Sequence, residues 1–146
     1  MKCLDKLPAT TVDEALEYID KISVSIKNGD AILWGITVRD DPKIIGTICY
    51  WRMEKEHYRA EIGYVLHPDY TGKGMMHEAL TEVLNYGFQK MKLHSVEARV
   101  NPHNIPSIKI LEKNNFEREA YFKEDYFFDG RFLDTVVYSL LTPLAD

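Results

Sequence analysis

The sequence has few of the features that mark secreted, membrane-spanning or metal-binding proteins. It has only two cysteines in 146 residues, which is too few for a disulfide framework, and they match no metal-ligand spacing. No apolar run approaches the roughly 18 to 20 residues that span a bilayer. Residues 1–9 also lack the basic start and the apolar stretch of a secretory signal. We therefore expect a cytoplasmic protein that has no membrane segment and binds no metal.

Positive charge is also scarce, since the net charge of the chain is -5. Such a chain has no broad basic surface for a phosphate backbone, so direct nucleic-acid binding is not expected. The acidic balance mildly favours a cationic partner such as an amine. Hydrophobic residues make up 45% of the chain and charged residues 28%, which allows a buried core. The length suits a single domain that spans residues 1–146.

Strand-like and helix-like patterns alternate along the chain. A helix is expected to start at Thr10, and Asp129-Gly130 is a strong hairpin signal. Alternating or continuous apolar runs predict strands over residues 31–38, 44–51, 60–66, 95–100, 116–128 and 132–141. Helical periodicity predicts helices over residues 72–90 and 106–114. This order indicates an α/β (α+β) domain in which helices flank one mixed, mostly antiparallel sheet.

The most informative local motif is the turn Tyr70-Thr71-Gly72-Lys73-Gly74, which opens the longer helix. A helix start leaves backbone N–H groups without partners, and its dipole favours negative charge. The two glycines allow a positive φ and a close approach to a ligand. The turn therefore predicts a pyrophosphate cradle. It is neither a Walker loop nor a dinucleotide fingerprint, because the residues required after the second glycine are missing.

Motifs along nearly the whole chain carry a family resemblance. In order, they are Ile45-Gly46-Thr47-Ile48, Ala60-Glu61-Ile62-Gly63-Tyr64-Val65-Leu66, the turn at Tyr70, Glu78-Ala79-Leu80, Asn101-Pro102-His103-Asn104-Ile105-Pro106-Ser107, Leu111-Glu112-Lys113 with Phe116, and Asp129-Gly130 with Asp134 and Tyr138. In this order they resemble the GNAT superfamily of N-acetyltransferases, in particular the ribosomal-protein alanine N-acetyltransferase branch. The resemblance implies transfer of an acetyl group from acetyl-CoA to a primary amine.

The resemblance also implies where the donor lies. In such proteins two neighbouring strands splay apart, and the CoA pantetheine arm occupies the gap and pairs with strand backbone. The matching positions here are Val65 and Leu66. The pyrophosphate would bind the turn amides of Thr71, Gly72, Lys73, Gly74, Met75 and Met76, and Asn104 and Ser107 would line the arm and its thiol.

Glu61 is the first candidate for the general base that deprotonates the amine. It alternates with Ile62 and Tyr64 and so lies on the opposite face of its strand from those side chains. Family members with a base on this strand have it at a matching position. The alternative is a structural glutamate that pairs with Arg59 or Arg52.

The leaving thiolate needs a proton or a hydrogen bond. Many relatives use a tyrosine on the helix after Asn104, but this sequence has Ile110 and Leu111 there. Ser107 is the main replacement, and Tyr121 or Tyr126 could reach the cleft from the final hairpin. The alternative for each tyrosine is a role in lining the core or the groove.

The acceptor is left open by the sequence. Either a protein N-terminal amine or a small amine such as a polyamine, an amino acid or an antibiotic would fit, and a third alternative is a non-catalytic acyl-CoA-binding module. Relatives of this kind begin with a strand and a helix that we expect this chain to lack. An open sheet edge would result, which a second copy in a homodimer could cover.

Overall fold

The computed structural model describes residues 29–38 and 40–143. Its strands are β1 Ile32–Thr37, β2 Ile44–Glu54, β3 Arg59–Leu66, β4 Ser95–Val100, β5 Glu117–Phe128 and β6 Arg131–Leu141. Its helices are α2 Met75–Gln89 and α3 Ile105–Lys113, with short 3-10 turns η1 Lys55–His57 and η2 Pro68–Tyr70. The helix expected near Thr10 lies outside the described residues. Within the described ranges, no helix is long and apolar enough to cross a membrane.

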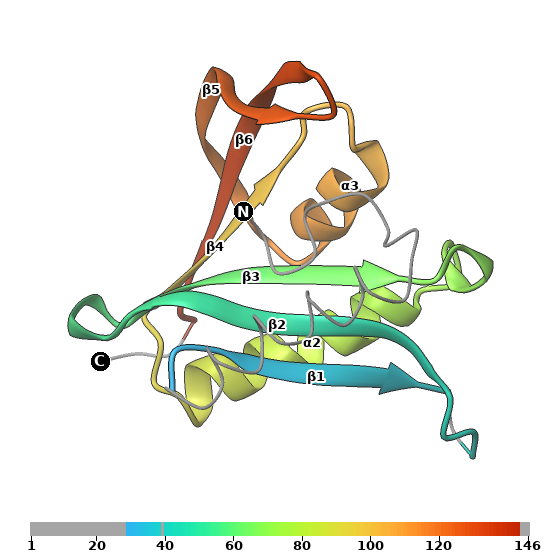
Figure 1. The fold of residues 1–146 in the computed structure, drawn as a ribbon. Coiled ribbons are helices and arrows are strands. Elements are labelled where there is room, and N and C mark those ends of the chain that lie inside the picture. The colour runs from blue at the N-terminus through green and yellow to red at the C-terminus, as the bar shows by residue number, and fades with distance from the viewer. Residues whose placement is uncertain (1–28, 39, 144–146) are drawn as a thin grey trace.

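The strands form one sheet with the order β1-β2-β3-β4-β6-β5 (Figure 1). Neighbouring strands are antiparallel except for β3 and β4, which are parallel. This arrangement confirms the expected mixed, mostly antiparallel sheet. The hairpin between β5 and β6 turns at Asp129 and Gly130, whose φ angles of 51° and 77° are the positive values that such a turn requires.

The parallel pair β3 and β4 separates part-way along its length. Pairing runs from Arg59 opposite Ser95 to Glu61 opposite Glu97, and then it ends. β3 continues to Leu66 alongside β2 only, while β4 continues alongside β6. Figure 1 shows β4 and β6 turning away from β3, with α3 in the angle between them. We call this divergence the fork, and it confirms the expected splayed strand pair.

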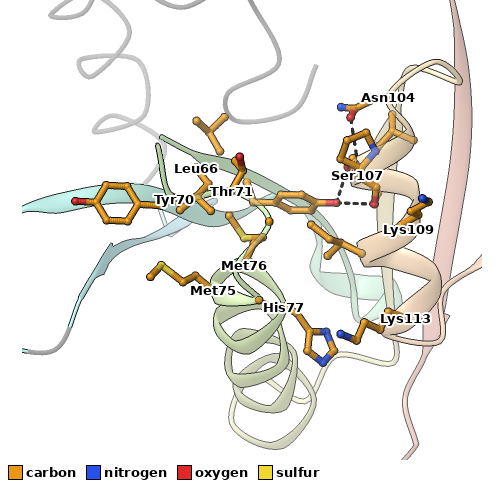
Figure 2. Close-up of a pocket in the computed structure, with 18 of the residues that line it drawn as sticks. Leu66, Tyr70, Thr71, Met75, Met76, His77, Asn104, Ser107, Lys109 and Lys113 are labelled. Atoms are coloured by element: carbon orange, nitrogen blue, oxygen red, sulfur yellow. Dashed lines mark hydrogen bonds between the residues drawn. The ribbon is translucent and has the colours of Figure 1, made fainter. Parts of the chain in front are cut away.

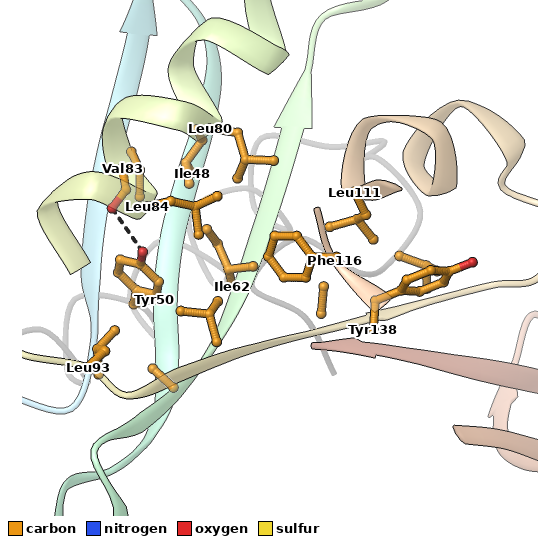
Figure 3. Packing of buried hydrophobic residues seen from close by; sticks show 14 of the residues in the cluster. Ile48, Tyr50, Ile62, Leu80, Val83, Leu84, Leu93, Leu111, Phe116 and Tyr138 are labelled. Atoms are coloured by element: carbon orange, nitrogen blue, oxygen red, sulfur yellow. Dashed lines mark hydrogen bonds between the residues drawn. The ribbon is translucent and has the colours of Figure 1, made fainter. Parts of the chain in front are cut away.

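The main core lies between α2 and the sheet, and α3 extends it on the other side of the fork (Figure 3). The apolar stripe of α2 is buried there, with Leu80 fully inaccessible. On β2, the Tyr50 hydroxyl donates a hydrogen bond of 2.9 Å to the carbonyl of Val83 in α2. This contact brings the Tyr50 hydroxyl against Gly87, where a Cβ atom would collide with it.

Backbone conformation moves two element boundaries from those expected. α2 begins at Met75 rather than at Gly72, because Gly72 and Gly74 have φ angles of 76° and 78°. β2 extends to Glu54, with an irregular register after Trp51 where Arg52 has a φ of 48°.

Candidate active site

A cavity of about 630 Å³ lies at the fork, between β3 and β4 and beside the starts of α2 and α3. Every expected donor-binding residue except Lys73 lines it, namely Val65, Leu66, Thr71, Gly72, Gly74, Met75, Met76, Asn104 and Ser107 (Figure 2). The ammonium of Lys73 instead lies 5.8 Å from the centre of the Tyr70 ring. The structure therefore brings together residues that are far apart in the sequence.

The turn before α2 offers backbone donors at one end of this cavity. Gly72 and Gly74 have positive φ angles, and open space surrounds both, so conformation rather than crowding makes glycine suitable. The first hydrogen bond that closes the helix runs from the Glu78 amide to the Gly74 carbonyl, at 3.1 Å. The amides of residues 75–77 precede it and have no acceptor within the helix. This end of the cavity is suited to an anion.

Two hydroxyl groups meet on the opposite wall of the cavity. The Tyr64 hydroxyl on β3 lies 2.7 Å from Ser107 Oγ on α3, where either hydroxyl can be the donor, and 3.4 Å from the Ser107 carbonyl oxygen, which is an alternative acceptor for the phenol hydrogen. Asn104 caps α3, since its Oδ1 accepts from the Ser107 amide at 3.3 Å. The dashed lines at Ser107 in Figure 2 mark these bonds. Ser107 is thus held in place from two sides.

Tyr64 was not among the expected site residues. Burial raises the pKa of its phenol to about 12, although the hydrogen bond with Ser107 acts in the opposite direction. The phenol therefore stays protonated near neutral pH. The alternation of β3 was the available signal, because Tyr64 shares a face with Ile62, and both side chains line the cavity.

Glu61 lies at the last paired position before the fork, and its side chain is only 2% exposed. It is absent from the cavity lining, in agreement with its place on the other face of β3. Arg52 Nη1 lies 3.5 Å from Glu61 Oε1, but neither carboxylate oxygen has a hydrogen-bond partner within residues 29–38 and 40–143. Burial raises the pKa of Glu61 to about 7, against the opposing effect of Arg52.

Glu97, directly across from Glu61 on β4, has the opposite environment. Arg59 and Arg99 both donate hydrogen bonds to its carboxylate, at 2.5 Å and 2.9 Å. Burial alone would raise the pKa of Glu97, but these bonds outweigh it and hold the pKa below its usual value. Arg59 therefore neutralises Glu97, and Glu61 keeps only the half-exposed Arg52 as its ion-pair partner among the described residues.

The final hairpin contributes a different aromatic residue from the one expected. Tyr126 is half-buried on β5 and does not line the cavity, whereas Phe128 does. The two rings contact each other, with centroids 6.4 Å apart. Tyr121 is exposed, and its hydroxyl donates to Asp134 at 2.5 Å. Neither tyrosine is brought to the cavity wall.

A family model described as an acetyltransferase (GNAT) domain matches residues 1–117. The chain belongs to the GNAT acetyltransferase family. It is an acyl-CoA-dependent N-acetyltransferase, as its relatives also indicate.

Of three curated relatives of this GNAT chain, two have a named acceptor. An uncharacterized N-acetyltransferase p20 of Bacillus licheniformis is 35% identical over 140 residues, which is 96% of this chain and 79% of the relative. The ribosomal protein uS5-alanine N-acetyltransferase of Escherichia coli is 33% identical, over 80% of this chain and 61% of that protein. The spermidine N(1)-acetyltransferase of Vibrio cholerae is 26% identical, over 62% and 53% respectively.

Solved GNAT structures share the fold. The ribosomal-protein-S5-alanine acetyltransferase of Vibrio fischeri aligns with a TM-score of 0.81 at 23% identity, over 95% of this chain and 78% of that one. RimJ of Mycobacterium smegmatis, in complex with CoA-disulfide, also aligns with a TM-score of 0.81, at 24% identity over 90% and 63%. This acetyltransferase therefore shares its fold with solved structures, one of which was determined in complex with CoA-disulfide.

Proposed function

We propose that this protein transfers an acetyl group from acetyl-CoA to a primary amine, by direct attack within a ternary complex. The observation that carries the proposal is the cavity at the fork, which has free backbone amides at one end and the Ser107 hydroxyl on its wall. A long, thin donor with an anionic centre and a reactive thioester end matches those two chemical features.

The donor is held chiefly by backbone. The Thr71 amide already donates to the Pro68 carbonyl at 3.3 Å, so the amides of residues 72–76, around the positive φ angles of Gly72 and Gly74, bind the pyrophosphate. The extended pantetheine arm lies along β3 at Val65 and Leu66, on the flank that β4 has left. Its two amides then replace the strand hydrogen bonds that end at Glu61.

The proton path uses both faces of β3. The amine approaches from the Glu61 side and gives a proton to that carboxylate, because only the neutral amine can attack the thioester carbonyl. The new N–C bond forms while the C–S bond breaks, and the second proton that the nitrogen loses as the amide forms passes to the departing thiolate, which leaves as the CoA thiol. Ser107 donates its hydroxyl hydrogen bond to the departing sulfur, and Tyr64 in turn donates to Ser107. Tyr64 keeps its proton in this arrangement, since its pKa exceeds that of a thiol.

Two acceptor classes remain in competition. A protein N-terminal amine is the first, supported by the 33% identity with the enzyme that acetylates ribosomal protein uS5. A small polyamine-like amine is the second, supported by the weaker match to the spermidine enzyme and by the acidic balance of the chain.

An amine-panel assay with acetyl-CoA tests the proposal, with N-terminal peptides and small polyamines as separate arms. Thiol release above the amine-free background is the expected result, and the arm that responds identifies the acceptor class. Thermal unfolding with acetyl-CoA tests the donor alone. A ligand at 100 times its Kd stabilises the native state by about 2.7 kcal/mol, so the melting temperature must rise.

The outcomes separate the alternatives. A thermal shift without turnover on any amine would indicate an acyl-CoA-binding module and overturn the enzymatic proposal. The absence of any shift at saturating acetyl-CoA would overturn the donor assignment itself.

A further inference from the structure

Three nitrogen-bearing side chains line the cavity away from the reacting groups. His77 comes from the first turn of α2, and Lys109 and Lys113 come from α3, which faces it. Figure 2 shows the side chains of His77 and Lys113 close to each other, between the two helices. None of the three has a part in the proton path. We call them the basic cluster.

The two lysines of the basic cluster form an unneutralised pair. They are four residues apart on α3, so they share one face of the helix, where like charges repel. Both are exposed, and neither forms a salt bridge with any described residue. The nearby acid Glu112 is directed elsewhere, since its Oε2 accepts from Tyr138 at 3.5 Å. In a chain with a net charge of -5, this local excess of positive charge is suited to an anion.

His77 is oriented by a fixed amide. Asn114 Nδ2 donates to the Ile110 carbonyl at 3.0 Å, and because a carbonyl can only accept, this bond fixes the orientation of the amide. The Thr81 hydroxyl lies 3.1 Å from Asn114 Oδ1 and 2.8 Å from the His77 carbonyl, and its one hydrogen is shared between these two acceptors. The second Nδ2 hydrogen then faces His77 Nδ1, 3.0 Å away. Nδ1 must accept, and the ring proton is on Nε2, which remains available as a donor.

We propose that the basic cluster binds the 3′-phosphate of the CoA donor. CoA carries two separate anionic groups, a pyrophosphate and a phosphomonoester, and the turn before α2 accounts for only the first. The basic cluster adds two mobile ammonium groups and one aligned N–H donor, which is a set of donors suited to a phosphomonoester. This inference rests on the proposed function, because it assumes that the cavity holds CoA.

Isothermal titration with CoA and with dephospho-CoA, which lacks only the 3′-phosphate, tests the inference. For the native protein we expect CoA to bind about 10- to 100-fold more tightly, as charge-assisted hydrogen bonds imply. In the double variant Lys109→Gln/Lys113→Gln, the affinity for CoA should fall while that for dephospho-CoA stays constant, so that the preference disappears. His77→Ala should reduce the preference in part.

The matched control is the double variant Lys43→Gln/Lys90→Gln, which removes the same charge from exposed lysines outside the cavity. It should keep the full preference for CoA, and circular dichroism should show native folding for every variant. The single variants Lys109→Gln and Lys113→Gln replace the double variant if it folds poorly.

Each of the other possible titration results would reject a specific part of the proposal. Equal affinity of the native protein for the two ligands removes the 3′-phosphate site but leaves the proposed function intact. An equal loss of both affinities in the lysine variant would assign these lysines to the pyrophosphate instead. Failure of the native protein to bind either ligand rejects the inference together with the proposed donor.

Discussion

Glu61 and Glu97 lie directly opposite each other across β3 and β4, yet their surroundings shift their pKa values in opposite directions. Two arginines hold Glu97 ionised, whereas burial holds the Glu61 pKa near 7. When the pKa values of two neighbouring carboxyl groups are shifted apart in this way, the group with the pKa near 7 is the one suited to exchange protons at neutral pH. Glu61 is that group, and no side chain or amide in the described part of the chain donates a hydrogen bond to its two oxygens that would compete with an incoming amine.

Glu61→Gln should therefore lower kcat by about 100- to 10,000-fold, which is the range of general base catalysis. The native rate should rise with pH and level off above about 7, because only the ionised carboxylate accepts a proton. The variant should lose this rise. Steady-state kinetics over pH 5.5–9, with CoA affinity as the control for intact donor binding, would check it. Retention of both rate and pH profile would exclude Glu61 as the base.

The same substitution should change stability in a way that does not depend on the acceptor. The folded-state pKa of Glu61 lies above the ordinary value of 4.5, so between these values the folded protein retains a proton that the unfolded chain has released. The native free energy of unfolding should thus fall, relative to that of Glu61→Gln, as pH rises from about 4.5 to about 7. Urea denaturation at several pH values measures this difference. A difference that stays constant with pH would contradict the raised pKa.

Arg52 should tune the pH profile from outside the cavity. Its guanidinium lies 3.5 Å from Glu61 and 4.7 Å from the centre of the Trp51 ring, and its charge lowers the Glu61 pKa. Arg52→Gln should move the midpoint of the pH–rate profile upward, with Arg131→Gln on the exposed hairpin as a control that leaves it unchanged. A downward or absent shift in Arg52→Gln would remove Arg52 from this role.

At the scale of elements, local patterns predicted most of the architecture, because each strand and helix of the described chain has an apolar period of its own. Boundaries moved where backbone conformation opposed the pattern, as at Gly72 and Gly74 before α2. Contacts between different elements were harder to predict from the sequence. The hydrogen bond between Tyr64 and Ser107 joins residues 43 positions apart, and no local period encodes it. Lys73 was expected to contribute its backbone amide, and the turn motif held no signal for its side chain, which lies over the Tyr70 ring rather than on the cavity wall.

The contact between α2 and β2 predicts a result contrary to helix propensity. Gly87→Ala should favour the helix by about 1 kcal/mol. The new Cβ would however collide with the Tyr50 hydroxyl, and such overpacking typically costs about 1 to 3 kcal/mol. We expect a net decrease in the free energy of unfolding, measured by urea denaturation. Asn85→Ala, at an exposed site of the same helix, is the control that should be neutral or slightly stabilising. A Gly87→Ala protein more stable than the native one would contradict the packing of Tyr50.

At the scale of the whole molecule, the fork divides the sheet into two parts. β1, β2 and β3 form one part, and β4, β6 and β5 form the other, joined through three residue pairs from Arg59 to Glu61. α2 and α3 complete the walls between them. A ligand in the cavity would therefore contact both parts at once.

Amide hydrogen exchange should report this bridging. On addition of acetyl-CoA, exchange should slow in residues 62–66, whose flank toward β4 has no strand partner in the described structure, and in the turn at residues 71–77. Residues 32–37 of β1, on the far edge of the sheet, serve as the internal reference and should change little. If exchange slowed equally in the reference residues 32–37 and in residues 62–66 and 71–77, the result would indicate general stabilisation rather than binding at the fork.

The fork also has a consequence for how the acceptor specificity of such a protein can change in evolution. Under the proposed function, the donor is recognised largely by main-chain groups, which every residue except proline supplies alike. Substitutions at Val65 or Leu66 would then alter the donor site little, whereas the acceptor side depends on individual side chains such as Glu61 and Arg52. One sheet can in this way keep a single donor while its acceptor changes through a few point mutations.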